Sequence, residues 1–202
     1  MAEGEYVLCL KSSKLVKSHI IPLSFYKQGN PFFKKDDGIK IFSSKSSREK
    51  RSPNGVYSSI FCDACEKSFL ESDSKIHFIL KRYGNDSISR VTSIVDKMIL
   101  DRFVPSLLLR AHFSTHKLFG NFDLGGKYVE SIRAYLLGQS NYPDSILYFF
   151  CKYPKHVGIH SPSIFKRTEG FRFWVFYMGI YSLYLKIDSR PLPESHPFFC
   201  FF

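Results

Sequence analysis

The sequence lacks an apolar run long enough to cross a membrane. Its longest apolar stretch, residues 171–185, contains Arg172 and Gly179 and is shorter than the ~20 residues that a spanning helix needs. The first five residues, Met-Ala-Glu-Gly-Glu, lack the basic start and apolar core of a secretory signal. No repeat at the period of a solenoid or propeller is visible. We therefore expect a cytoplasmic protein without membrane partners.

Cysteine and acidic residues are both scarce. Five cysteines are an odd number, and only Cys62 and Cys65 lie close together, which argues against a disulfide framework and favours metal-binding or core roles. The 18 Asp and Glu face 29 Lys and Arg, giving a net charge of +11. Such an excess attracts polyanions, so nucleic acid is the favoured partner, with a merely solvated basic surface as the alternative.

The patterning predicts an α+β fold. Residues 5–10 and 15–21 predict either two short strands or a strand and a knuckle. A long mobile loop over 29–54 with a brief strand at 39–42, and then a strand over 56–61, precede a helix that begins at Asp63. The middle predicts helices over 86–103, from Pro105 to His116, and over 128–137, and the last quarter predicts antiparallel strands over 146–151, 171–177 and 180–187. We divide the chain into a ββα unit, residues 1–82, and a helical and β region, residues 83–202, packed on it as one body.

Three sequence features follow one another in an order that is typical of a known class of metal-binding protein. Cys9 lies ten residues before His19, which sits in Ser18-His-Ile-Ile-Pro22, and Cys62-Asp-Ala-Cys65-Glu66 follows at the strand–helix junction. This arrangement resembles the HNH (His-Me finger) nucleases, and in particular a group of uncharacterised bacterial proteins of that type. Further likeness comes from Ser106-Leu-Leu-Leu-Arg110, Leu124-Gly125 and Glu130-Ser-Ile-Arg133, so the resemblance covers residues 6 to 150.

The resemblance implies roles for individual residues. His19 would be the general base that activates water, Glu66 a ligand for Mg or Mn, and Asn54 or Ser18 an orienting group. A core or capping histidine is the alternative for His19. Basic side chains would hold the nucleic-acid backbone, or would simply be solvated; they are Lys45, Arg48, Lys50, Arg51 and Lys67.

The chain departs from the usual HNH pattern. Ser18 stands beside the histidine where Asp or His is usual, Glu66 replaces a helix histidine, and Asn54 is equally explained by a turn with Gly55. Tyr6 occupies the place of a further cysteine. Cys9, Cys62 and Cys65 would then bind structural zinc with water or a remote ligand such as Cys151, or form an emptied site packed by Tyr6.

Three other features allow two interpretations each. Arg110 either pairs with a carboxylate such as Glu130, its neighbouring histidines being partly exposed, or lines a pocket with His112, Ser114 and His116. The aromatic strands around Trp174 either pack a sheet core or stack nucleic-acid bases. The tail 196–202, with four Phe, either enters the core or docks on a protein partner.

The leading functional hypothesis is a metal-dependent HNH-type endonuclease that hydrolyses DNA in preference to RNA, with phage defence as a setting suggested by analogy. The first alternative is a non-catalytic nucleic-acid- or protein-binding effector that keeps the finger as a scaffold. The second is a structural subunit that joins an assembly through its hydrophobic tail.

Overall fold

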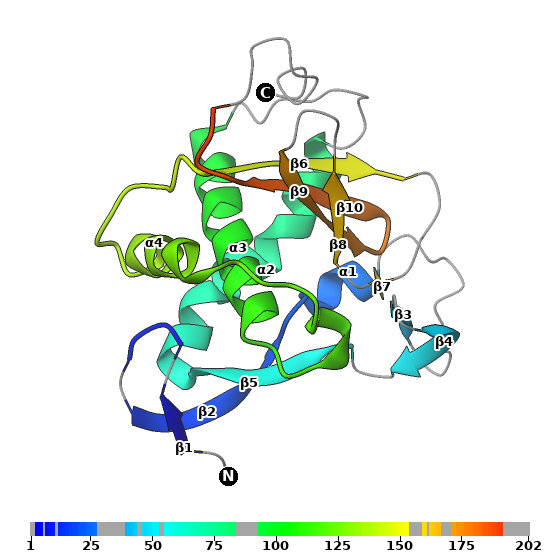
Figure 1. Ribbon diagram of the computed structural model, residues 1–202, viewed down its shortest axis with the longest axis horizontal. Coiled ribbons are helices and arrows are strands. Elements are labelled where there is room, and N and C mark those ends of the chain that lie inside the picture. The colour runs from blue at the N-terminus through cyan, green and yellow to red at the C-terminus, as the bar shows by residue number, and fades with distance from the viewer. Residues whose placement is uncertain are drawn as a thin grey trace.

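The molecule consists of two β-sheets with helices between them. In the computed structural model, helices α2 (Asp63–Tyr83) and α3 (Ile94–His112) run side by side through the centre, with a small sheet at one end and a larger sheet at the other (Figure 1). The structure describes residues 3–5, 7–10, 12–27, 39–43, 46–52, 55–83, 93–153, 159–160, 162–166 and 171–191. This mixture of helices and mainly antiparallel strands confirms the α+β class.

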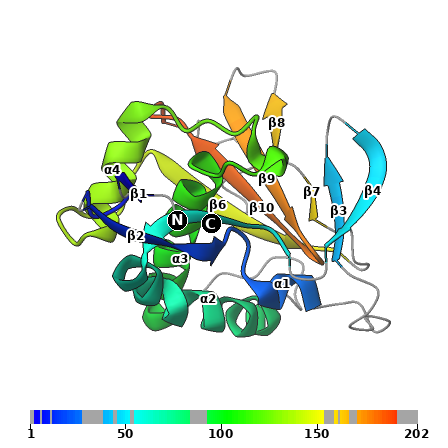
Figure 2. The ribbon, with the colours of Figure 1, turned by 90° about the horizontal axis from the view of Figure 1, so that it is seen from below.

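The small sheet is built from the N-terminal part of the chain. Its strands are β1 (Glu3–Glu5), β2 (Ser12–His19) and β5 (Tyr57–Cys62), antiparallel in the order β1-β2-β5. Strand β5 continues directly into α2, which lies across β2 and β5 on the same side as the short helix α1 (Leu23–Lys27) (Figure 2). The expected succession of strand, strand and helix is therefore present.

Helix α2 has the charge pattern of a stable surface helix. Asp63 and Glu66 occupy its first turn, and Lys81 and Arg82 its last, which suits the helix dipole at both ends. Its buried residues recur at helical spacing and pack against the small sheet and α3; they are Cys65, Phe69, Ser72, Ile76, Ile79 and Leu80.

Helix α3 corrects one prediction. Ser93 caps its start by accepting a hydrogen bond from the backbone N–H of Asp96, and the helix continues without a break to His112. Pro105 therefore lies inside the helix and does not begin a new one. A proline removes one helical hydrogen bond, but residues 103–111 of α3 are buried all round, and this packing holds the helix together.

The chain then passes through a short 3-10 helix, η1 (Lys117–Phe119), and helix α4 (Gly126–Leu136). Gly138 follows α4 with a φ of 73°, in the left-handed region that suits glycine after a helix end. The predicted third helix and its glycine stop are confirmed.

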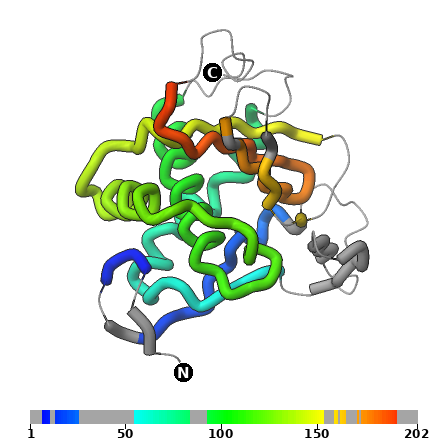
Figure 3. Tube along the Cα trace, viewed as in Figure 1, coloured from blue at the N-terminus to red at the C-terminus, as the bar shows by residue number. Residues whose placement is uncertain are grey.

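The large sheet contains seven strands in the order β4-β3-β7-β9-β10-β6, with β8 also paired to β9. They are β3 (Ile39–Ser43), β4 (Ser46–Ser52), β6 (Ile146–Lys152), β7 (Ile159–His160), β8 (Ser163–Lys166), β9 (Arg172–Met178) and β10 (Tyr181–Ile187). Gly179, with a φ of 73°, forms the two-residue turn between β9 and β10, as predicted. Figure 3 follows the chain from β5 through the helices to β6, β9 and β10 of this sheet.

Strand β4 corrects a second prediction. We expected residues 29–54 to form a loop with only one brief strand, but most of the basic run 45–51 pairs with β3 as a second strand. The run has no β-branched residue to signal a strand, and its strand state arises from pairing with the apolar Ile39–Phe42 segment.

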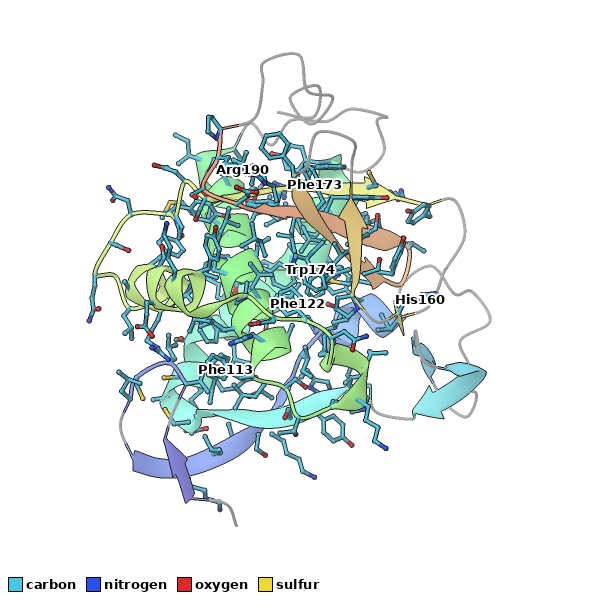
Figure 4. All side chains as sticks on the ribbon, in the orientation of Figure 1. Phe113, Phe122, His160, Phe173, Trp174 and Arg190 are labelled. Carbon is cyan, nitrogen blue, oxygen red and sulfur yellow. The ribbon has the colours of Figure 1, made fainter. Side chains whose placement is uncertain are left out.

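One hydrophobic core connects the sheets and helices. Its buried members extend from Leu8 in the N-terminal turn to Ile187 at the end of β10. Trp174 is 3% exposed and meets Phe122 at a centroid distance of 4.7 Å (Figure 4). The core interpretation of the aromatic strands is confirmed at Trp174. None of the described helices is long and apolar enough to pass through a bilayer.

Candidate metal centre

Three cysteine thiols meet where β5 joins α2. The Sγ atoms of Cys9, Cys62 and Cys65 all lie within 4.8 Å of one another, although Cys9 is 53 residues from Cys62 in the chain. Cys9 Sγ and Cys62 Sγ are 3.8 Å apart. Among the residues that the structure describes, this is the one group of three or more His, Cys, Asp or Glu side chains placed to hold a metal ion.

The spacing of the thiols fits a tetrahedral soft-metal site. With zinc–sulfur bonds of about 2.3 Å, two sulfurs of a tetrahedron lie about 3.8 Å apart. The Cys9–Cys62 separation equals that value, and thiolates are the ligands that zinc prefers in structural sites. The predicted approach of Cys9 to the Cys62–Cys65 pair is therefore confirmed. Cys151, suggested as a remote fourth ligand, lies on β6 of the large sheet and does not belong to this group.

The turn that carries Cys9 is firmly anchored. Leu8 is 2% exposed and belongs to the core, and Arg133 Nε of α4 donates to the Val7 carbonyl over 2.7 Å. Leu10 has a φ of 54°, a left-handed conformation that costs a residue other than glycine about 1–2 kcal/mol. Strain of this kind is retained where the surrounding structure imposes it, and Leu10 directly follows Cys9 in the anchored turn.

The local hydrogen bonds give the thiols unequal acidity. Burial raises the pKa of Cys62, but hydrogen bonds from the Cys65 backbone N–H and from the neighbouring thiols outweigh it, so the pKa of Cys62 is lowered. Burial and the neighbouring sulfurs raise the pKa of Cys65 to about 12. Cys62 therefore loses its proton more readily than Cys65, and a bound cation would favour deprotonation of its thiol ligands.

His19 lies at the opposite end of the same strand pair. Leu15 of β2 is opposite Cys62, whereas His19 is opposite Tyr57. Four residues of strand separate Leu15 from His19, about 13 Å at the usual rise per residue. The half-buried imidazole packs edge-on against the Tyr57 ring at 5.7 Å. The thiol group and the predicted base thus lie at opposite ends of the β2–β5 strand pair.

The other predicted site residues of β2 and α2 are buried or form ion pairs within the protein. Ser18 is fully buried, because alternate residues of β2 face the core. The Glu66 carboxylate lies 3.6 Å from the buried guanidinium of Arg110, which competes with any cation for that carboxylate. Lys67 is exposed and forms an ion pair of 2.6 Å with Asp63.

The predicted nucleic-acid residues are only partly placed. Arg48, Lys50 and Arg51 lie on β4, whose side chains are not described. Lys45 and Asn54 fall outside the described residues, as do Tyr6 and the tail 196–202.

The expected pairing of Arg110 with a carboxylate is confirmed, but Asp73 supplies that carboxylate and Glu130 does not. Arg110 donates from Nη1 to Asp73 Oδ1 over 3.1 Å, and its Nη2 lies 2.8 Å from Asp73 Oδ2, whereas Glu130 pairs with Arg133. Glu66 and Asp73 are seven residues apart on α2 and therefore share one face of it. That spacing is the sequence signal that would have identified both carboxylates as candidates for one cation.

The histidines that follow Arg110, His112 and His116, accept hydrogen bonds from backbone N–H groups of the following segment. His112 Nδ1 accepts from the Leu124 backbone N–H over 3.4 Å, and His116 Nδ1 accepts from that of Leu118 over 3.2 Å. Burial lowers the pKa of His112, although Asp123 opposes the shift. The half-buried state of both histidines agrees with the interpretation that they are structural.

Comparison of the chain with protein-family models, with curated proteins and with solved structures found no match.

Proposed function

We propose that this protein is an HNH-type, metal-dependent endonuclease that acts on DNA, with His19 as the general base. In this proposal the thiols of Cys9, Cys62 and Cys65 hold a structural zinc ion that joins the hairpin to α2. The observation that supports the proposal is the meeting of Cys9 with the Cys62–Cys65 pair, because the zinc interpretation of the motifs depends on that contact.

The position of His19 suits a base. It is half-buried at the end of β2, so one ring nitrogen can be fixed by protein while the other reaches solvent. A neutral imidazole there would take a proton from the water that attacks the phosphodiester. A bound Mg or Mn ion would supply charge neutralisation at the scissile phosphate. The net charge of +11 favours approach of the polyanionic substrate.

A non-catalytic nucleic-acid-binding effector is the second candidate function. The contact between Glu66 and Arg110 favours it, since a carboxylate that faces a buried guanidinium is a poor ligand for a second cation. The two candidates differ in one respect: the enzyme must cut the nucleic acid, whereas the effector only binds it.

Plasmid nicking distinguishes these candidates. We expect the wild-type protein to nick supercoiled DNA with Mg or Mn, and His19→Ala to reduce the rate at least 100-fold, within the range that a general base contributes. His77→Ala is the matched control, because His77 is also half-buried but lies on the middle of α2. It should retain wild-type activity.

Two outcomes would overturn the nuclease proposal: equal nicking by wild type and His19→Ala, or binding of DNA without cutting under any divalent metal. The latter result would establish the effector. Metal analysis of purified wild type and Cys62→Ser tests the zinc assignment separately, with one zinc per chain expected in the former and less than a tenth of that in the latter.

A further inference from the structure

Two sulfurs of the thiol group lie close enough for oxidation to join them as a disulfide. Cys62 is the last residue of β5 and immediately precedes α2, and its Sγ accepts a hydrogen bond from the Cys65 backbone N–H over 3.4 Å. This hydrogen bond holds the Cys62 sulfur in place at the junction of β5 and α2, and cysteine sulfur is the atom that peroxides oxidise.

The Cys9 thiol lies beside the Cys62 thiol. Cys9 Sγ lies 3.8 Å from Cys62 Sγ, and Cys9 is half-buried, whereas Cys62 and Cys65 are 8% and 9% exposed. Closing from 3.8 Å to a disulfide of about 2.05 Å brings the two sulfurs less than 2 Å closer together.

We propose that Cys62 is a peroxide-modified residue and that Cys9 is its resolving thiol. The Cys62 thiolate attacks hydrogen peroxide, cleaves the O–O bond and, with one proton taken up, becomes a sulfenic acid as water leaves. The Cys9 thiol then attacks the Cys62 sulfur, a second water leaves, and the Cys9–Cys62 disulfide forms. Two thiols are oxidised and one peroxide is reduced to two waters.

This modification would control the metal site. Two of the three proposed zinc ligands are consumed by the disulfide, so peroxide would release zinc; this consequence rests on the proposed function. Formation of the disulfide itself does not need the metal, and the two claims are tested separately.

The test uses the full chain with Cys151→Ser and Cys200→Ser, which leaves the three thiols of the group. The protein is reduced, freed of metal with a chelator, treated with one equivalent of hydrogen peroxide and alkylated. Digestion with trypsin and a protease that cleaves before Asp63 separates the peptide of Cys62 from that of Cys65, so mass spectrometry identifies the linked pair.

We expect the Cys9–Cys62 disulfide as the main product, unchanged in yield by the additional substitution Cys65→Ser. With Cys9→Ser, a dimedone adduct should accumulate on Cys62, at least fivefold above its level with Cys9 present. A main product joining Cys62 to Cys65, or complete alkylation of all three thiols after peroxide, would overturn the proposal. Zinc release from metal-loaded protein, read with a chromophoric chelator, then tests the regulatory consequence.

Discussion

Two parts of the molecule each bury a positive charge, but they surround it with different polar partners. Beside α2, Arg110 of α3 is completely buried, and in the large sheet Lys186 of β10 is 2% exposed. Both cations lie beside aromatic rings: Arg110 is 5.2 Å from the centroid of Phe69, and the Lys186 ammonium is 5.8 Å from that of Phe171. The apolar surroundings are similar, but the charged partners are not.

Arg110 is held by carboxylates, whereas Lys186 donates to a backbone carbonyl. The guanidinium lies against Asp73 and Glu66 of α2, and Lys186 Nζ donates to the Asp188 carbonyl over 2.6 Å. Burial lowers the pKa of Lys186, with the Asp188 carboxylate opposing and Arg190 supporting the shift. Arginine cannot relieve burial by losing its proton, so the α2–α3 contact depends on charge pairing. The end of the large sheet depends instead on packing.

Replacement of Arg110 should have the largest effect on stability. Arg110→Leu leaves Asp73 and Glu66 facing apolar rings without a cation, and we expect the free energy of unfolding to fall by about 3–5 kcal/mol. Urea denaturation at pH 7, followed by circular dichroism, measures it. Adding Asp73→Asn to Arg110→Leu should recover part of the loss, because the stranded charge is then removed. A loss below 1 kcal/mol in the single variant would show that the pair contributes little.

Local sequence patterns predicted much of the fold. The β5–α2 junction was visible because the apolar period changes from two to helical spacing after Cys62, and the β9–β10 hairpin because Gly179 interrupts two aromatic runs. The single helix α3 was not predicted, because Pro105 is a helix breaker by local propensity and only burial on all sides overcomes it. Strand β4 was not predicted for a similar reason, because its pairing with β3, and not its own residues, determines its structure.

The candidate site was also predicted in part. The zinc interpretation of the motifs depended on an approach of Cys9 to Cys62 and Cys65, and the antiparallel pairing of β2 with β5 brings these cysteines together. The partner of Arg110 was not predicted, because sequence does not reveal which face of α2 packs on α3. Tertiary contact between those two helices places Asp73, rather than Glu130, beside the guanidinium.

Asp188 should give a smaller, acid-dependent effect at the sheet end. Hydrogen bonds from Arg190 outweigh burial and lower the pKa of Asp188 from 3.8 to about 2. A carboxyl with a depressed folded-state pKa stabilises the protein above its unfolded pKa, and this stabilisation is lost as the pH falls from about 4 to about 2. Because Arg190 is 57% exposed, solvent screening reduces the contribution to about 1–2 kcal/mol. Asp188→Asn should flatten that part of the acid unfolding curve; an unchanged slope would contradict the assignment.

Lys186 should give the smallest effect, and it tests the comparison most directly. Lys186→Met keeps a long, unbranched side chain in the same space, removes a cation whose burial is unfavourable, and loses one hydrogen bond to the Asp188 carbonyl, so the opposing changes should leave stability within about 1 kcal/mol of wild type. The measurement is urea denaturation under the conditions used for Arg110→Leu. If Lys186→Met destabilises the protein as much as Arg110→Leu does, the end of the large sheet also depends on its buried charge, because loss of packing volume alone is too small to explain such a loss.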